Sequence, residues 1–195
     1  YCLMPNHLHL HLQQFGSYPL SRLMQGLQTA YTKHFNKRHR MIGHVFQGRY
    51  KALLVERDSY LLELVRYIHL NPFRAKIVDR AGMYPWSSHA QYIDQEKQPV
   101  VSVHKDEVLA IFGNSKGEKS YRKFFLEGLN EGHRSNLYET DNWQVLGSEG
   151  FTKRVLARRG SKPERLLKLR MGIGTIWNQI KGREHLKEEP MGRVR

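Results

Sequence analysis

The chain has 195 residues with a single cysteine, and its 32 Lys and Arg residues outnumber 18 Asp and Glu residues, giving a formal net charge of +14. This length predicts one domain, or one domain with a small appendage. A hydrophobic content of 39% excludes extensive disorder, and no apolar run is long enough to span a membrane. The lone cysteine excludes a disulfide framework and favours a reducing, cytoplasmic location. The charge indicates a polyanionic partner, most simply nucleic acid.

The first half of the chain alternates between strand and helix patterns. His7 to Leu12 alternates His with Leu, which predicts a strand with leucines on one face and histidines on the other. Apolar residues three and four apart predict a helix over Leu20–Lys37, and Val45–Glu56 is typical of a strand or hairpin arm. A second helix is predicted from about Tyr60 to Leu70. We expect Pro72 to end it, because proline disfavours the α conformation of the preceding residue.

The start of the chain is unusual for a domain. Residue 1 is Tyr, and the strand pattern begins within a few residues of it. A domain rarely begins in the middle of an element. We therefore expect the domain to lack its first strand and helix.

The second half is predicted to be helical and becomes strongly basic. Short helices are expected near Trp86–Tyr92, at His104–Phe112 and at Lys119–Leu129. From Lys153 to Arg195 there are 13 Lys and Arg residues and 4 Glu residues, which leaves a charge of +9. This region is either a helix-turn-helix-like appendage or a basic extension that binds phosphate non-specifically. The helices of such an appendage would be Phe151–Leu156, Glu164–Leu169 and Ile173–Ile180.

Two histidines of the first strand pattern are candidate metal ligands. His7 and His9 are two residues apart, so both imidazoles project from the same face, where two neutral nitrogens can chelate a divalent metal. The alternative is an exposed polar face at the edge of a sheet, and a bare His-x-His pattern favours that alternative. His11 is either a third ligand or a bystander.

Two residues of the second helix are candidates for the chemistry itself. Tyr67 and Asn71 are four residues apart and so lie one turn apart on the helix surface. A phenol can act as a nucleophile and a carboxamide can offer an oxygen ligand. Spacing alone favours another interpretation, in which Tyr67 lies at the boundary of the core and Asn71 caps the helix before Pro72.

Taken together, four stretches in order resemble the REP-associated tyrosine transposases. This family belongs to the insertion-sequence-200-like branch of the HUH (His-hydrophobe-His) nucleases, which act on single strands. The resemblance is strong over about residues 1–95 and weak to about residue 155. The stretches that carry it are MPNHLHL at residues 4–10, GHVFQGRYKA at 43–52, RYIHLNPFRA at 66–75 and YPWSS at 84–88.

The resemblance implies a fold and a reaction. The implied fold is α+β, an antiparallel sheet with covering helices in a ferredoxin-like HUH core that is N-terminally incomplete here. His7 and His9 match the metal ligands of the family, Asn71 matches the amide that completes the site, and Tyr67 matches the nucleophile. The family's metal is Mg²⁺ or Mn²⁺, whereas the residues alone lean slightly toward Mn²⁺ or Zn²⁺. The implied activity is cleavage and rejoining of single-stranded DNA through a 5′-phosphotyrosine.

A cluster of cationic and aromatic residues is predicted to bind the DNA. Cations follow phosphates, and aromatic faces stack on unpaired bases. Alternatively, the aromatic residues belong to the core and the cations form a solvated face. The predicted DNA-binding residues are Lys33, Lys37, Arg38, Arg40, Arg49, Tyr50 and Lys51.

These patterns divide the chain into three parts: a catalytic domain over residues 1–95, a helical extension over 96–148 and the basic region over 149–195. The predicted function is that of a metal-dependent transposase acting on single-stranded or hairpin DNA as a monomer or homodimer. One alternative is an inactive relative that binds repeat DNA or regulates it. Another is a small-molecule metal hydrolase, disfavoured by the charge of +14 and by the lack of a Glu base beside the histidines.

Overall fold

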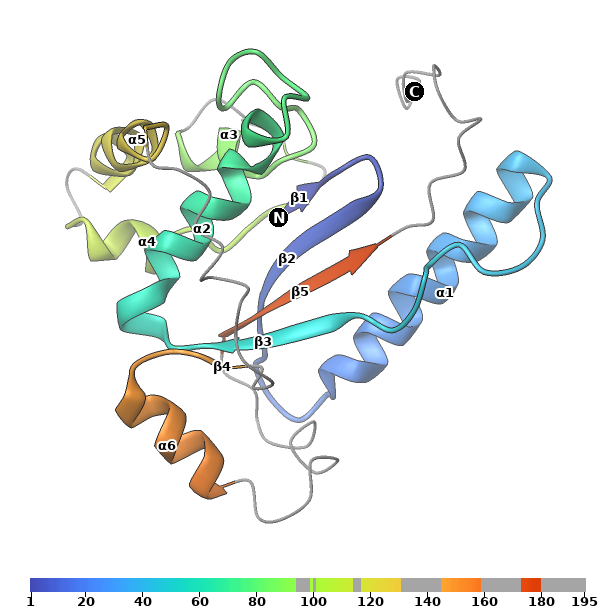
Figure 1. Cartoon of the computed structure of the whole chain (residues 1–195), viewed down its shortest axis with the longest axis horizontal. Helices are drawn as coiled ribbons and strands as arrows, with labels where there is room; N and C mark the ends of the chain where they lie inside the picture. The colour runs from blue at the N-terminus through green and yellow to red at the C-terminus, as the bar shows by residue number, and fades with distance from the viewer. Residues whose placement is uncertain (94–98, 100, 114–116, 131–144, 159–172, 180–195) are drawn as a thin grey trace.

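A computed structural model describes residues 1–93, 99, 101–113, 117–130, 145–158 and 173–179. Over these ranges the chain is α+β, and one five-stranded sheet has helices on both faces (Figure 1). The strands run in the order β1-β2-β5-β3-β4, and all pairings are antiparallel except that of β3 with β4. The predicted α+β class is confirmed. No helix in these ranges is long and apolar enough to cross a membrane.

The histidine strand is β2 (His7–Gln13), which pairs with the short β1 (Cys2–Leu3). Its alternation sorts its side chains between the two faces of the sheet, as predicted. Leu10 and Leu12 pack on the face covered by α1 (Leu20–His39), where Leu20 and Met24 are buried against them. The odd-numbered residues of β2 therefore face the other way.

The opposite face is covered by α2 (Arg57–Arg74), which follows β3 (Lys51–Val55). The predicted strand over Val45–Glu56 is thus shorter than expected. The prediction that Pro72 ends the helix is wrong, because α2 continues to Arg74 with Pro72 inside it. Pro72 lies in the last turn, where it removes one hydrogen bond to the carbonyl four residues earlier, and its buried ring packs in the core and offsets that loss.

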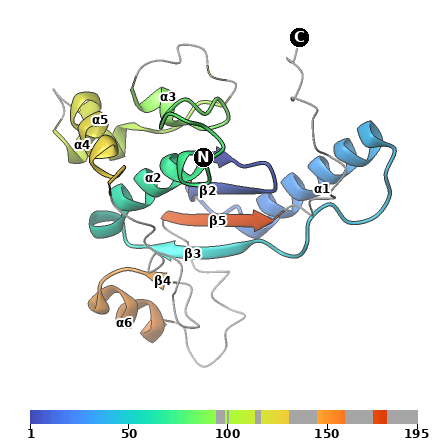
Figure 2. The same ribbon diagram turned by 45° about the horizontal axis from the view of Figure 1, so that its top comes forward.

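Three further helices group beside α2, as Figure 2 shows: α3 (His89–Tyr92), α4 (Asp106–Ile111) and α5 (Gly117–Glu127). All three were predicted with slightly different ends. They share a second core with one side of α2. Its buried residues are Leu61, Val65, Leu70, Tyr92, Val108, Tyr121 and Phe125.

The C-terminal part contributes β4 (Val145–Leu146), α6 (Glu149–Arg158) and β5 (Ile173–Gln179). The predicted helix at Phe151–Leu156 lies within α6, and Glu164–Leu169 lies outside the described residues. The helix predicted at Ile173–Ile180 is wrong, because Ile173–Gln179 is a strand between β2 and β3 (Figure 1). Gly174 and the β-branched residues of this segment disfavour a helix, and two open strand edges supply backbone partners.

Candidate active site

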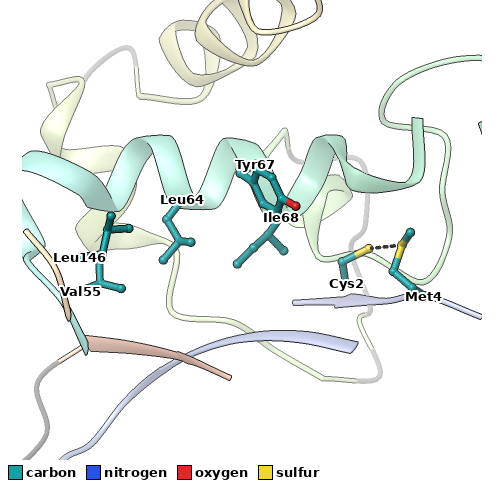
Figure 3. Close-up of a cluster of buried hydrophobic side chains, with 7 residues drawn as sticks. All are labelled: Cys2, Met4, Val55, Leu64, Tyr67, Ile68 and Leu146. Atoms are coloured by element: carbon teal, nitrogen blue, oxygen red, sulfur yellow. Dashed lines mark hydrogen bonds between the residues drawn. The ribbon is translucent and has the colours of Figure 1, made fainter. Parts of the chain in front are cut away.

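The candidate nucleophile lies on α2, on the side that faces the sheet. Tyr67 is only 6% exposed and belongs to an apolar cluster between α2 and the sheet, which Figure 3 shows. Asn71 is one turn further along and is also buried. The other members of the cluster are Cys2, Met4, Val55, Leu64, Ile68 and Leu146.

The two candidate ligands on β2 face each other. The Nε2 atoms of His7 and His9 are 3.1 Å apart, and the two rings meet edge to face. On the far side of the His7 ring, Nδ1 lies 2.6 Å from Oδ1 of Asn6. If Nδ1 carries the proton and donates it to Asn6, the lone pair of His7 Nε2 points to His9. This arrangement orients His7 as outer partners orient metal-binding histidines.

Asn71 and Tyr67 meet the same imidazole. The side-chain Nδ2 of Asn71 lies 2.6 Å from Nε2 of His9, and a half-turn of the carboxamide would put its oxygen there. The rings of His9 and Tyr67 meet edge to face with their centroids 6.1 Å apart. The four residues predicted from the sequence, His7, His9, Tyr67 and Asn71, therefore lie together.

Burial keeps the two imidazoles neutral. It lowers the pKa of His9 to about 3, and a charge on nearby His7 would lower the pKa further. Burial also lowers the pKa of His7, which is the less buried of the two rings. Neutral imidazole is the form that binds metals.

The spacing of these donor atoms suits a divalent cation. Two ligand atoms that each lie about 2.1 Å from a metal at right angles are about 3.0 Å apart. The separations of 3.1 Å and 2.6 Å around His9 Nε2 are close to this value. Within the described residues no group of three His, Cys, Asp or Glu side chains that could hold a metal ion is found, and the group that lies beside the two imidazoles is the carboxamide of Asn71.

A cation beside Tyr67 was not predicted from the sequence. The guanidinium carbon of Arg74 lies 5.8 Å from the centre of the Tyr67 ring, and its Nη2 donates to the carbonyl of Gly128. Arg74 follows Asn71 by three residues and Tyr67 by seven. At helical spacing these positions share a face, and that signal could have identified Arg74.

His11, the third histidine of the alternation, is half-buried on the same face as His9, and burial lowers the pKa of its imidazole to about 4. No described group hydrogen-bonds its Nε2 atom.

The predicted DNA-binding cations are all exposed, but they divide between the two faces. Lys33, Lys37 and Arg38 lie on α1, on the face opposite Tyr67. Lys51 lies on β3 and is placed differently. Its pairing partner on β5 is Trp177, and Trp177 also pairs with His9 on the neighbouring strand β2, so the three residues are aligned across the sheet. Directly paired residues point to the same face, so Lys51 lies on the side of His9, about 10 Å away across two strand spacings.

The other predicted DNA-binding positions follow α1. Arg40 ends the helix in the left-handed conformation, with φ 51°. Arg49 is exposed in the segment before β3. Tyr50 packs against the apolar cluster under α1, which favours the interpretation that this ring belongs to the core.

Comparison with known proteins relates the first part of the chain to a family. Residues 1–71 match the model of a family described as IS200-like transposase. This segment ends at Asn71 and includes His7, His9 and Tyr67. No curated protein and no solved structure matches the chain.

Proposed function

We propose that the chain cleaves and rejoins single-stranded DNA, because residues 1–71 match the model of the IS200-like transposase family, whose members act on DNA. The proposed target is a hairpin-forming repeat, and the proposed intermediate is a 5′-phosphotyrosine on Tyr67. The observation that carries the proposal is the meeting of a phenol, two neutral imidazoles and a carboxamide at one point of the fold. This set has the parts that a metal-assisted tyrosine nucleophile needs.

His7, His9 and Asn71 are the residues proposed to hold a divalent metal, Mg²⁺ or Mn²⁺. When bound, such an ion would neutralise negative charge on a phosphate oxygen. His7 is the least buried of the four site residues, so we infer that the substrate reaches the site from its side. Asn6 keeps His7 oriented through the hydrogen bond to Nδ1.

In the proposed reaction the phosphorus exchanges one ester bond for another, so the number of phosphodiester bonds does not change. The oxygen of Tyr67 loses its proton and attacks the phosphorus, and the bond from phosphorus to the 3′ oxygen breaks. One strand end leaves as a 3′-hydroxyl, and the other remains on Tyr67 through its 5′ phosphate. Attack by an incoming 3′-hydroxyl reverses these changes, so rejoining needs no ATP. Arg74 supplies a positive charge beside the ring on which negative charge develops.

Exposed cations are proposed to hold the strand. Lys51 is the candidate nearest the site, since the strand register puts it on the side of His9. Lys33, Lys37 and Arg38 are proposed to bind DNA on the α1 side. Their role would be affinity rather than alignment of the reacting phosphate.

The test is a covalent trap. The full chain is incubated with Mn²⁺ and a hairpin oligonucleotide labelled on the side that keeps the 5′ phosphate. We expect an adduct that survives denaturing electrophoresis with the wild type, and none with Tyr67→Phe. Tyr60→Phe is a matched control, because Tyr60 lies on the same helix and packs against the same cluster.

Two results would reject the proposed enzymatic activity. One is the absence of an adduct with wild type, and the other is equal labelling of wild type and Tyr67→Phe. If salt-sensitive binding of the oligonucleotide then survives both Tyr67→Phe and chelation of the metal, the chain is instead a repeat-DNA-binding protein.

A further inference from the structure

A second histidine of α2 is hydrogen-bonded through both ring nitrogens. His69 is 3% exposed. Its Nδ1 lies 2.6 Å from the hydroxyl of Tyr121 on α5, and its Nε2 lies 2.9 Å from Oγ of Ser88, just before α3. Both partners are themselves about 1% exposed. The ring therefore joins α2 to two other helical segments in a place that water does not reach.

His69 lies between the two site residues in sequence but on the other side of the helix. At 3.6 residues per turn, a step of two residues turns the side chain by about 200°. Tyr67 and Asn71, four residues apart, share the face toward β2, so His69 points away from it. Any rotation of α2 about its axis would move Tyr67 and Asn71 relative to His9 and would stretch the bonds of His69.

One placement of protons satisfies the whole chain of hydrogen bonds. His89 Nδ1, 3.0 Å from the Tyr121 oxygen, donates to it, and the phenol donates to Nδ1 of His69. His69 Nε2 then donates to Ser88, whose hydroxyl donates to the carbonyl of Tyr1. Directional bonds of this kind fix an angle, whereas apolar packing alone tolerates small rotations.

A second polar contact acts in the same direction. Nη1 of Arg66, three residues before His69, donates to the carbonyl of Phe124 near the end of α5, and its Nη2 pairs with Glu63. The partners of His69 and Arg66 on α5 and just before α3 lie outside residues 1–71, the segment that matches the family. The helix that carries the site is thus held by a part of the chain that the family match does not cover.

We propose that His69 is a positioning residue, and that its bonds to Tyr121 and Ser88 set the rotation of α2 that aligns Tyr67 and Asn71 with His9. This inference rests on the proposed function for its activity readout. Its metal readout rests on the proposed ligands alone.

The decisive variant is Tyr121→Phe, which removes one oxygen from the chain of bonds. Tyr92→Phe is the matched control, because Tyr92 is buried in the same core with its ring centre 5.0 Å from that of His69. No bond joins its hydroxyl to His69, Tyr121 or Ser88 in the described structure. Val108→Ala, in that core too, supplies a variant destabilised by loss of packing alone.

Two quantities are measured well below the unfolding temperature of each variant: the rate of adduct formation at saturating DNA, and the affinity for Mn²⁺. We expect Tyr121→Phe to reduce both by at least about tenfold, since small displacements of reacting groups cost rates of this order. The affinity for DNA is expected to stay unchanged. Tyr92→Phe and Val108→Ala are expected to keep the wild-type rate and Mn²⁺ affinity.

The outcomes separate the two proposals. A wild type that forms no adduct rejects the proposed function, and the Mn²⁺ affinities of the same variants still decide the role of His69. Equal Mn²⁺ affinity in Tyr121→Phe and Tyr92→Phe overturns that role. So does an equal loss of rate or Mn²⁺ affinity in Val108→Ala, because the effect would then follow stability alone.

Discussion

The two faces of the sheet use the same strand for different purposes. Toward α1, Leu10 and Leu12 meet Leu20 and Met24, and the contact is apolar. Toward α2, His9 from the same strand meets Asn71 and Tyr67. The α1 face stabilises the fold by removing apolar surface from water. The α2 face buries polar groups, which costs free energy unless they find partners, as His9 does beside Asn71.

This difference teaches where stability and chemistry can be separated. Neighbouring residues of β2 point to opposite faces, so a substitution one position along the strand changes which property is lost. The predictions below test that separation, or the parts of the fold on which it depends.

The largest effect is expected from replacing each of two neighbouring residues of β2, His9 and Leu10, by alanine in separate variants. His9→Ala should reduce Mn²⁺ affinity by more than about 100-fold and abolish the adduct, since even the outer partners of metal ligands are worth about 10–100-fold. Leu10→Ala should instead lower the free energy of unfolding by about 2 kcal/mol and leave Mn²⁺ affinity unchanged. Calorimetric titration with Mn²⁺ and urea unfolding measure the two quantities. Equal losses of Mn²⁺ affinity in the two variants would show that the faces are not separable.

The second prediction acts on both faces at once through β5. The backbone of Thr175 pairs with His11 of β2 and with Leu53 of β3. Thr175→Pro removes an N–H from a strand with neighbours on both sides and should destabilise the chain by about 3 kcal/mol. Mn²⁺ affinity should fall as well, because β5 pairs with β2 along the whole histidine strand. Thermal unfolding and Mn²⁺ titration measure these changes.

Thr175→Val is the control for that substitution, because Val keeps the backbone N–H and the strand preference of a β-branched residue. Thr175→Val should keep most of the wild-type free energy of unfolding and most of the wild-type affinity for Mn²⁺. If Thr175→Pro unfolds at the wild-type temperature, the position of β5 between β2 and β3 is contradicted.

How far the sequence could predict this molecule depended on how local each signal was. Periods of two and 3.6 residues predict the strand at His7, the long helix from Leu20 and the shared helix face of Tyr67 and Asn71. These periods can be read from residues that are close together in the sequence. The secondary structure of Ile173–Gln179, by contrast, is not decided by its local sequence. Its short apolar pattern fits either element, and the choice depended on the edges of β2 and β3, far away in sequence.

The site shows the same limit. The resemblance carried by four ordered motifs predicted His7, His9, Tyr67 and Asn71 as site residues, whereas their residue types and spacing alone favoured structural roles. The contacts around the site could not be predicted from the sequence. No motif indicates that Tyr121 and Ser88 hydrogen-bond to His69. Lys51 is placed on the α2 face by the register of β5, which joins residues far apart in the sequence.

The third prediction concerns acid, which should act on the α2 side because buried histidines lie there. Burial, and then the charge of Arg122, lowers the pKa of His89 to about 4. An unfolded chain binds this proton near pH 6.5, so the stability from His89 is fully present above that pH and is lost as the pH falls toward 4. His89→Gln should reduce the slope of the unfolding free energy against pH by up to about 1.4 kcal/mol per unit in this window. An unchanged slope in urea titrations between pH 6.5 and 4 would contradict the assignment.

The smallest effect is expected from single cations on the two sides. Lys51→Ala should slow adduct formation at saturating DNA by about three- to tenfold, the size of one charge-assisted contact near the site. Lys37→Ala is the matched variant, since Lys37 is also an exposed lysine and lies on α1, across the sheet. It should weaken DNA binding and reduce its salt dependence but leave the rate at saturation unchanged. Single-turnover rates over a series of DNA and salt concentrations separate these effects. A loss of rate in Lys37→Ala as large as in Lys51→Ala would mean that DNA alignment is shared by both sides, and that the α1 face does more than support the fold.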